Sequence, residues 1–269
     1  MKTALVISSC VAASHVGATA SAFCLQRLGH RVLTVPTTML GRHPGWGPPG
    51  GSALETAHLA SIWTAIKAQN ITIDAVMTGY MGDEDHVGLT AQIINDVKAA
   101  HPQAFVLVDP VMGDNGQLYI PEARAQAIKQ TLLPLADIIS PNIWELSYLT
   151  QRAAKTTAQV RKAASQLPCD ALITSVRHQG KIGAMLLSSP QACAVYHDEF
   201  SAVPHGGGDA LAATFIAHIL AGKSSAQALA QSTASIFEIL ATSAPNGELA
   251  LIKGQDALIN ASPLTLETL

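Results

Sequence analysis

Short runs of apolar, often β-branched residues alternate with longer helical stretches along most of this chain, and this alternation constrains its fold more than any other feature. Continuous apolar runs such as Phe-Val-Leu-Val are typical of strands that are covered on both faces. Strands that alternate with helices predict an α/β fold, with a mostly parallel central sheet flanked by helices on both faces. The predicted strands are residues 3–8, 31–35, 75–78, 105–108, 138–140 and 171–174, and the predicted helices are residues 18–28, 54–69, 89–100, 123–132, 143–149 and 157–166.

The pattern changes toward the end of the chain. Residues 182–187 and 192–197 indicate an antiparallel strand pair at the sheet edge, and residues 209–220 and 225–241 are strongly helical. No linker or change of composition divides the chain, and 48% of its 269 residues are hydrophobic while 13% are charged. Such a composition supports a large buried core. We therefore expect a single domain over residues 1–269.

Composition and charge exclude several classes of function. The net charge of −3 and the absence of a Lys/Arg block argue against a nucleic-acid partner. No window approaches the roughly 18 uninterrupted apolar residues of a membrane span, so we expect no membrane association. Ser8, Ser9, Ser14 and His15 interrupt the apolar N-terminus, which favours a buried strand and a loop over a signal peptide and predicts a cytoplasmic protein. The sequence contains no C-x-x-C or H-E-x-x-H pattern, which argues against disulfide and zinc sites.

The strongest motif is His205-Gly-Gly-Gly-Asp209, which a helix follows directly. Three glycines let the backbone direct its amides toward one point, because no Cβ is in the way. The helix N-terminus adds free N–H groups and partial positive charge, which favour a phosphate or a developing anion. Asp209 is either the N-cap of this helix or a general base, and the motif alone leaves both open. His205 either contacts a phosphate as a cation or is a loop residue without a role, and the sequence leaves both interpretations open.

A second motif, Asp109-Pro-Val-Met-Gly-Asp114, comes directly after the predicted strand 105–108. Its two carboxylates could hold Mg²⁺ through water, since Mg²⁺ prefers oxygen ligands and keeps much of its hydration. The alternative is a capped turn, because Pro and Gly are ordinary turn residues.

A third motif, Ser140-Pro-Asn-Ile-Trp-Glu145, again follows a predicted strand. Asn142 and Glu145 have the spacing of a capping box, and this structural interpretation is strong. The functional alternative is that both side chains point at the same metal and phosphates as Asp109. A weaker signal is Thr174-Ser175, whose hydroxyls either contact a nucleotide or belong to an ordinary polar loop.

All four motifs follow predicted strands, so a parallel sheet brings them to one edge. Carboxylates, an anion-binding glycine turn and hydroxyls are the groups that phosphoryl transfer requires. The chain has no G-x-x-x-x-G-K-[ST] loop, and no G-x-G-x-x-G follows its first strand. This argues against a P-loop kinase and a Rossmann dehydrogenase.

Together these motifs resemble the ribokinase-like vitamin kinases, and the N-terminal part resembles the pyridoxal kinases among them. The resemblance covers roughly residues 4–242. It rests on the segments Ser9-Cys-Val11, Val16-Gly17, Gln26-Arg-Leu-Gly29, His43-Pro-Gly-Trp-Gly47, Thr78-Gly-Tyr-Met-Gly82, DPVMGD, PNIWE, ITS and GGGDALAATF.

The resemblance implies a role for each matching residue in an ATP-dependent transfer of phosphate to the 5′-hydroxymethyl group of a vitamin B6 form. Asp209 would take the hydroxyl proton, and the amides from Gly206 through Gly207 and Gly208 to Asp209 would form an anion hole. Asp109 and Glu145 would lie near Mg²⁺, and ATP would contact Asp109, Asp114, Asn142, Thr174 and Ser175. Ser9 would bind the pyridine ring, in a pocket also lined by Val16, His43 and Tyr80. Family members are commonly homodimers, and a monovalent cation such as K⁺ often assists them.

The substrate end departs further from the family pattern than the catalytic end. Gly207 stands where the family usually has Thr or Val, which makes the loop more flexible. Pro44 replaces a residue with a hydroxyl and a backbone N–H. Two alternatives therefore stay open beside a vitamin B6 kinase: a hydroxymethylpyrimidine kinase, and a non-catalytic B6-binding protein.

Overall fold

The structure is a computed structural model that describes residues 1–188, 191–245 and 247–269. Within these residues ten strands form one sheet, in the order β12-β11-β10-β9-β8-β5-β4-β1-β2-β3. Its strands are β1 (Thr3–Val11), β2 (Arg31–Leu40), β3 (Gly51–Ala53), β4 (Ala75–Thr78), β5 (Phe105–Val108), β8 (Ile138–Ile139), β9 (Asp170–His178), β10 (Lys181–Ser188), β11 (Gln191–Asp198) and β12 (Glu267–Thr268).

The middle of the sheet is parallel and its edges are antiparallel. β1 pairs in parallel with both β2 and β4, and the parallel region continues through β5, β8 and β9. β10, β11 and β12 add antiparallel strands at one edge, and β3 does so at the other. The predicted α/β sheet and the predicted antiparallel pair are therefore confirmed.

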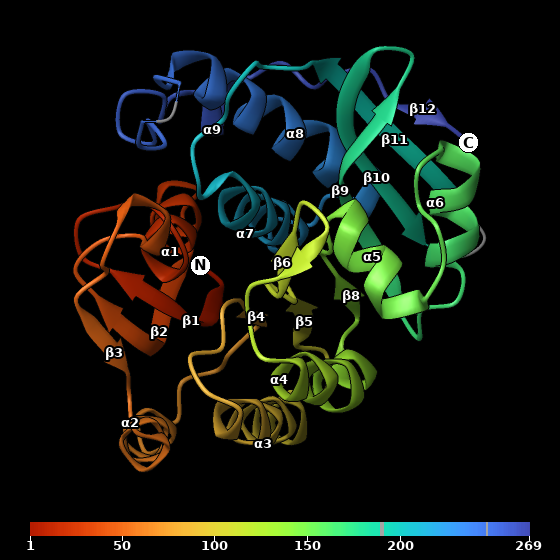
Figure 1. Cartoon of the computed structure of the whole chain (residues 1–269). Helices are drawn as coiled ribbons and strands as arrows, with labels where there is room; N and C mark the ends of the chain where they lie inside the picture. The colour runs from red at the N-terminus through yellow and green to blue at the C-terminus, as the bar shows by residue number, and fades with distance from the viewer. Residues whose placement is uncertain (189–190, 246) are drawn as a thin grey trace.

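Helices cover both faces of the sheet (Figure 1). One face packs against α1 (Ala18–Arg27), α7 (Gly207–Leu220), α8 (Ser225–Thr242) and α9 (Ala257–Asn260), and the other against α2 (Thr56–Lys67), α3 (Asp85–Ala100), α4 (Glu122–Ala127), α5 (Ile143–Thr150) and α6 (Thr157–Ala164). Single turns of other helix types occupy Pro44–Trp46, Ile128–Leu132 and Leu133–Leu135.

β1 illustrates why the central strands are apolar throughout. Ala4 and Val6 point into the core beneath α1 and α7, whereas Leu5 and Ile7 point into the core on the opposite face. All four side chains are at most 1% exposed. A strand that is buried on both faces has no polar positions to alternate with, which is why the sequence pattern was continuous.

The connections leave β1 and β4 in opposite directions. The chain runs from β1 to β2 on one side, and then returns through β4 to β5, β8 and β9 on the other. The boundary between β1 and β4 is therefore a topological switch point, where the loops at the carboxyl ends of the strands diverge and leave a crevice. Open α/β sheets bind their ligands in such crevices.

A small hairpin, β6 (Gly113–Asp114) and β7 (Gln117–Leu118), follows β5 and was not among the predicted elements. Its turn is Asn115-Gly116, and both residues have positive φ angles of 50° and 90°. Asn-Gly is the preferred sequence of a two-residue hairpin turn that needs this conformation.

Most predicted boundaries agree with the structure to within a few residues. The larger differences are β2, which continues to Leu40, and β9, which continues to His178. β3, α9 and β12 lie outside the predictions because each has at most four residues and no periodic pattern. Among the described helices, none combines the length and hydrophobicity that a membrane crossing requires.

Candidate active site

The glycine turn before α7 begins at Gly206, where only glycine fits the backbone conformation. Gly206 has a φ of 96°, and a Cβ there would overlap the carbonyl oxygen of His15. Gly206 is the N-cap of α7, and its carbonyl accepts the amide of Ala210. The amides of Gly207, Gly208 and Asp209 lie in the first turn of α7, and therefore have no acceptor within the helix. They form a cluster of free donors at the positive end of the helix dipole.

Asp209 is not the N-cap, because Gly206 holds that position. Its Oδ2 accepts a hydrogen bond from the Gly17 amide at 2.9 Å, and Gly17 lies in the loop after β1. Its Oδ1 faces Gly79, the first residue after β4, at 3.8 Å from the position of a Cβ there. Asp209 therefore lies at the switch point between β1 and β4. Burial raises its pKa to about 6, and the hydrogen bond from Gly17 opposes that increase.

A cavity of about 150 Å³ lies beside Asp209 at the carboxyl ends of the strands. It joins the N-terminus of α7 to the ends of β5, β8 and β9. The parallel sheet brings three of the predicted motifs together, but the glycine motif follows the antiparallel strand β11 and reaches the cavity through the loop before α7. Its lining residues are Asp109, Val111, Tyr119, Ser140, Asn142, Glu145, Leu172, Thr174, Gly208, Asp209, Leu211 and Ala212. A larger, shallow hollow of about 400 Å³ lies along α5 toward Lys155, and its lining contains no acidic residue.

Asp109 supplies the second carboxylate of the cavity. It is 9% exposed, and its pKa is raised above the usual range by burial and by the negative charges of Glu145 and Asp209. Val111, two residues on, has a φ of 41°, a conformation that β-branched residues rarely adopt. A strained backbone of this kind persists only where the surrounding structure enforces it, and it is often found at functional sites.

Glu145 and Asn142 form the capping box of α5. The Asn142 side chain accepts the amides of Trp144 and Glu145, and Glu145 Oε2 accepts the Asn142 amide at 2.9 Å. Glu145 Oε1 also accepts the amides of Met112 at 2.8 Å and Gly113 at 3.4 Å. The carboxylate therefore joins the loop after β5 to the loop after β8. Burial nevertheless raises its pKa to about 7, although these three amides lower it.

The donors around the cavity suit a hydrated cation better than a closed protein cage. No group of three or more His, Cys, Asp or Glu side chains that could hold a metal ion occurs in the part of the chain that the structure describes. Both oxygens of Glu145 already accept backbone amides. Asp109 is the carboxylate left to face a metal, and Mg²⁺ is commonly bound through one or two carboxylates, waters and phosphate oxygens.

The remaining residues predicted for ATP occupy different positions. Thr174 lines the cavity, and its amide donates to Pro141 at 3.0 Å. Ser175, which is outside the cavity lining, has a φ of 60°. Asp114 is exposed in the hairpin, where its carboxylate accepts the Asn115 amide at 2.7 Å.

The residues predicted for the substrate end come from the loops around β1, β2 and β4. Ser9 is buried directly beneath Gly17, whose Cβ position is 2.5 Å from Ser9 Oγ. Val16 is buried, and its Cγ1 lies 3.2 Å from the Cβ position of Gly206. Tyr80 is half-buried and packs against the core on the α2 and α3 face. None of them lines the 150 Å³ cavity.

His43 connects the Gly/Pro-rich loop to the glycine turn. Its ring stacks on His205 with 4.1 Å between centroids, and Trp46 meets both rings edge-on. Its Nδ1 accepts the Gly45 amide at 3.1 Å. Burial and the neighbouring His205 lower the pKa of His43, so that the neutral ring is favoured. His205 is therefore a packing partner of the loop and not a solitary loop residue.

Four residues that lie at this site were given no role from the sequence, although Gly17 and Gly79 belong to segments that carry the family resemblance. Gly17 donates to Asp209, Gly79 lies beside it, and Tyr119 lines the cavity. Ser8 Oγ is buried and has no hydrogen-bond partner among the residues that the structure describes, and a Cβ on Gly79 would overlap it. A detectable signal existed for Gly79, because it directly follows the predicted strand 75–78. The role of Gly17 depends on a contact across 192 residues, which no local pattern contains.

Comparison with known proteins adds independent evidence. The family model described as phosphomethylpyrimidine kinase matches residues 51–251. The pyridoxal kinase PdxY of Leifsonia xyli is 33% identical, with 95% of each chain covered, and that of Corynebacterium diphtheriae is 32% identical, with 94% of each covered.

Solved structures show that the fold is shared. The crystal structure of pyridoxal kinase from Entamoeba histolytica has a TM-score of 0.94, at 24% identity over all of both chains. The pyridoxal kinase of Leishmania donovani in complex with ADP and pyridoxamine has a TM-score of 0.91, at 23% identity over all of both chains. The fold is therefore ribokinase-like. Because the family match spans most of the chain and the curated relatives align over nearly all of it, the protein belongs to the family of pyridoxal and phosphomethylpyrimidine kinases.

Proposed function

We propose that this protein is an ATP-dependent kinase that phosphorylates the 5′-hydroxymethyl group of pyridoxal, or of pyridoxine or pyridoxamine. Its curated relatives are named pyridoxal kinases. The observation that carries the proposal is the position of Asp209: a partly buried carboxylate beside the first-turn amides of α7, facing a cavity with further carboxylates.

Asp209 acts as the general base in this mechanism. The alcohol oxygen forms a bond to the γ-phosphorus of ATP, the bond to the β,γ-bridging oxygen breaks, and ADP leaves with that electron pair. The alcohol proton passes to Asp209. A pKa of about 6 suits this task, because the carboxylate is ionised at neutral pH and still basic enough to accept a proton.

The glycine turn stabilises the charge on the phosphoryl group during transfer. The amides of Gly207, Gly208 and Asp209 point outward from the first turn of α7, where the helix dipole adds partial positive charge. Fixed backbone donors of this kind need no reorganisation during the reaction, which makes them effective. Gly206 contributes the bend that directs these amides into the cavity.

Asp109 is the residue that we propose to hold Mg²⁺ directly, with Glu145 beside it. The negative charges of Glu145 and Asp209 help to raise the pKa of Asp109, and a cation beside Asp109 would relieve that repulsion. When bound, Mg²⁺ would neutralise charge on the ATP phosphates. Glu145 acts mainly by holding the loop of Asp109 in place through its amide hydrogen bonds.

We assign the nucleotide to the ends of β8 and β9 and the vitamin to the loops after β1, β2 and β4. Asn142, Thr174, Ser175 and the hairpin residue Asp114 are the proposed ATP contacts. Ser9, Val16, His43 and Tyr80 are the proposed vitamin contacts. The contacts of Val16 with Gly206 and of His43 with His205 support this assignment, because they place the vitamin loops against the glycine turn.

The finer properties follow the family pattern. We propose one kinase domain over the whole chain, a homodimer, and assistance from a monovalent cation such as K⁺. The use of ATP suits the cytoplasm, which is the compartment that we propose.

A hydroxymethylpyrimidine kinase is the second candidate, because the matching family model carries the phosphomethylpyrimidine kinase description. ADP release with ATP and Mg²⁺ separates the two candidates when each B6 alcohol and hydroxymethylpyrimidine are supplied in turn. We expect turnover with at least one B6 alcohol. Turnover with the pyrimidine alone would contradict the proposal, and B6 binding without any turnover would indicate a non-catalytic binding protein.

A further inference from the structure

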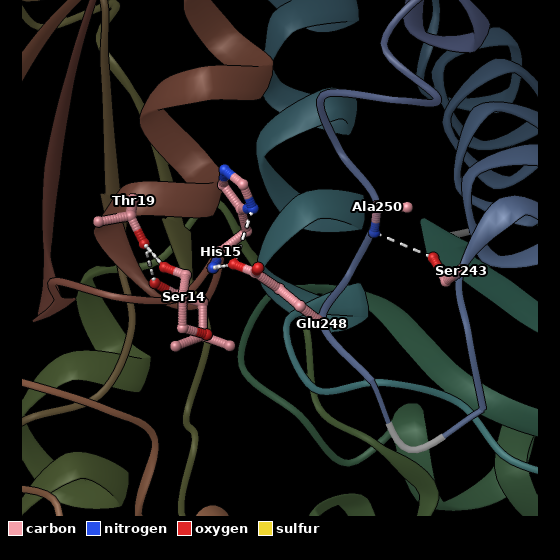
Figure 2. Close-up of polar contacts among 7 residues, drawn as sticks. Ser14, His15, Thr19, Ser243, Glu248 and Ala250 are labelled. Atoms are coloured by element: carbon pink, nitrogen blue, oxygen red, sulfur yellow. Dashed lines mark hydrogen bonds and ion pairs between the residues drawn. The ribbon is translucent and has the colours of Figure 1, made fainter.

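The loop between β1 and α1, residues 12–17, is held from two sides. On one side the Thr19 hydroxyl lies 2.7 Å from both the Ser14 and the Val16 carbonyl oxygens. On the other side Glu248, from the segment after α8, reaches across to His15 (Figure 2). Two segments 233 positions apart in the sequence therefore meet at this loop.

Glu248 contacts both the backbone and the ring of His15. Its Oε1 accepts the His15 amide at 2.9 Å, and His15 Nδ1 lies 3.0 Å from the same oxygen. A carboxylate that accepts a backbone N–H makes a charge-assisted hydrogen bond, which is stronger than a neutral one. The side chain of Glu248 is 45% exposed, so the contact is at the surface and its effect should be moderate.

The segment that carries Glu248 is itself anchored. Leu249 and Leu251 are at most 1% exposed and belong to the core beneath α1, α7 and α8. The Ala250 amide donates to Ser243 Oγ at 3.0 Å (Figure 2), and that hydroxyl donates to the Ile239 carbonyl. Glu248 therefore projects from a fixed support and not from a free chain end.

The loop that Glu248 holds makes two contacts with the catalytic elements. The Gly17 amide donates to Asp209 Oδ2 at 2.9 Å. The His15 carbonyl oxygen lies against Gly206, so closely that a Cβ at position 206 would overlap it. Both contacts depend on the position of the short loop of residues 12–17, and Glu248 holds this loop at His15.

We propose that Glu248 is a positioning residue for phosphoryl transfer, which holds the loop of residues 12–17 so that the Gly17 amide stays on the Asp209 carboxylate and His15 stays against the glycine turn. This inference rests on the proposed kinase function. Glu248 touches neither Asp209 nor the cavity, and acts through the loop.

The test compares two substitutions of similar size at one position. Glu248→Leu removes the acceptor, whereas Glu248→Gln keeps an oxygen for the His15 amide. Glu238→Leu is the matched control, since Glu238 is an exposed glutamate on α8 with no polar side-chain contact in the described residues. All variants are checked for folding by circular dichroism, and kcat is measured with pyridoxal and ATP as a function of pH.

We expect kcat of Glu248→Leu to fall about fivefold to tenfold, because small displacements of a catalytic group are costly. The acid limb of its pH profile should move to higher pH, because the Gly17 N–H favours the ionised form of Asp209. Asp109 and Glu145 titrate in the same cavity in every variant, so the difference between variants reports on the loop. Glu248→Gln should stay close to the wild type, and so should Glu238→Leu.

A second readout needs no turnover. The carboxyl carbon of Asp209, identified in the NMR spectrum by its absence in Asp209→Asn, can be titrated in the wild type and in Glu248→Leu. We expect the pKa of Asp209 to be higher in Glu248→Leu. An unchanged titration together with an unchanged kcat would overturn the role of Glu248. Failure of the wild type to phosphorylate any B6 alcohol would instead refute the proposed function, and the titration would still test the positioning role.

Discussion

The proposed phosphoryl-transfer end and the proposed vitamin end of this site are held by different forces. At the transfer end, carboxylates accept backbone amides: the buried Glu145 accepts three, and the partly buried Asp209 accepts that of Gly17. At the vitamin end, a Gly/Pro-rich loop is held through the aromatic stack of His43, Trp46 and His205. Hydrogen bonds to buried charges fix atoms closely, whereas aromatic contacts tolerate small shifts. Substitutions at the transfer end should therefore affect kcat, and those at the vitamin end should affect KM.

The largest effect is expected from Asp209→Asn, which removes the base and keeps its shape. We expect kcat to fall about 10³-fold, in the range that general-base catalysis contributes. The same substitution should stabilise the fold at neutral pH by about 2 kcal/mol. Burial raises the pKa of Asp209, so its ionised form destabilises the folded protein at neutral pH, and Asn carries no charge. That gain should shrink as the pH falls below about 6, where Asp209 itself becomes protonated.

Steady-state kinetics and urea unfolding at several pH values measure both effects. Asp198→Asn is the control, since Asp198 is exposed on β11. A wild-type kcat for Asp209→Asn would show that Asp209 is not the general base. It would also contradict the expectation that substitutions at the transfer end lower kcat.

Gly206→Ala and Gly207→Ala test whether the glycine turn depends on one special position. Gly206 has a φ of 96° and no room for a Cβ. Alanine there should lower the free energy of unfolding by about 2 kcal/mol and reduce kcat. At Gly207 the nearest atom to an added Cβ is Leu240 Cδ2 at 4.0 Å, so alanine should be neutral or slightly stabilising. Equal unfolding midpoints for the two variants would contradict this difference.

His43→Ala sharpens the comparison from the vitamin side. Without the ring, the loop loses its stack on His205. We expect KM for pyridoxal to rise about tenfold while KM for ATP changes less than about twofold, because a binding contact and not the chemistry is lost. His58→Ala, in an exposed position on α2, is the control. A fall in kcat with an unchanged KM would show that the two ends are not separate.

Gly207→Thr should give the smallest effect. It restores the kind of side chain that the resemblance to the family implies at this position, and the nearest atom to an added Cβ is Leu240 Cδ2 at 4.0 Å. Replacing glycine reduces the freedom of the unfolded chain, so we expect a gain of about 0.5 kcal/mol and a kcat within about twofold of the wild type. A large loss of kcat would mean that the free space at Gly207 is needed by a ligand.

Much of the fold was predictable because its signals are local. The strands 75–78 and 105–108 agree with β4 and β5 residue for residue, since both are short apolar runs. The meeting of Asp109 and Asn142 at one sheet edge follows from parallel topology alone, whereas Asp209 comes after the antiparallel strand β11 and reaches this edge through the loop before α7. The hairpin of β6 and β7 also has a local signal, its turn sequence Asn115-Gly116.

The features that could not be predicted from the sequence are contacts between residues far apart along the chain. That both Glu145 oxygens bind amides, two of them more than 30 residues away, depends on how two loops approach each other. The stack of His43 on His205 joins segments 162 positions apart in the numbering, and neither residue type predicts it. Glu248 lies in a segment without any motif, and only its distance to His15 identifies it.

The pH dependence of kcat in the wild type and in Asp209→Asn tests most directly whether Asp209 is the base. For the wild type we predict that kcat with pyridoxal falls as the pH decreases through about 6, because the carboxylate becomes protonated. The residual turnover of Asp209→Asn should lack the contribution of Asp209 to that limb, while the contributions of Asp109 and Glu145 stay the same. The same acid limb in both proteins, at similar kcat, would contradict the assignment of Asp209 as the base.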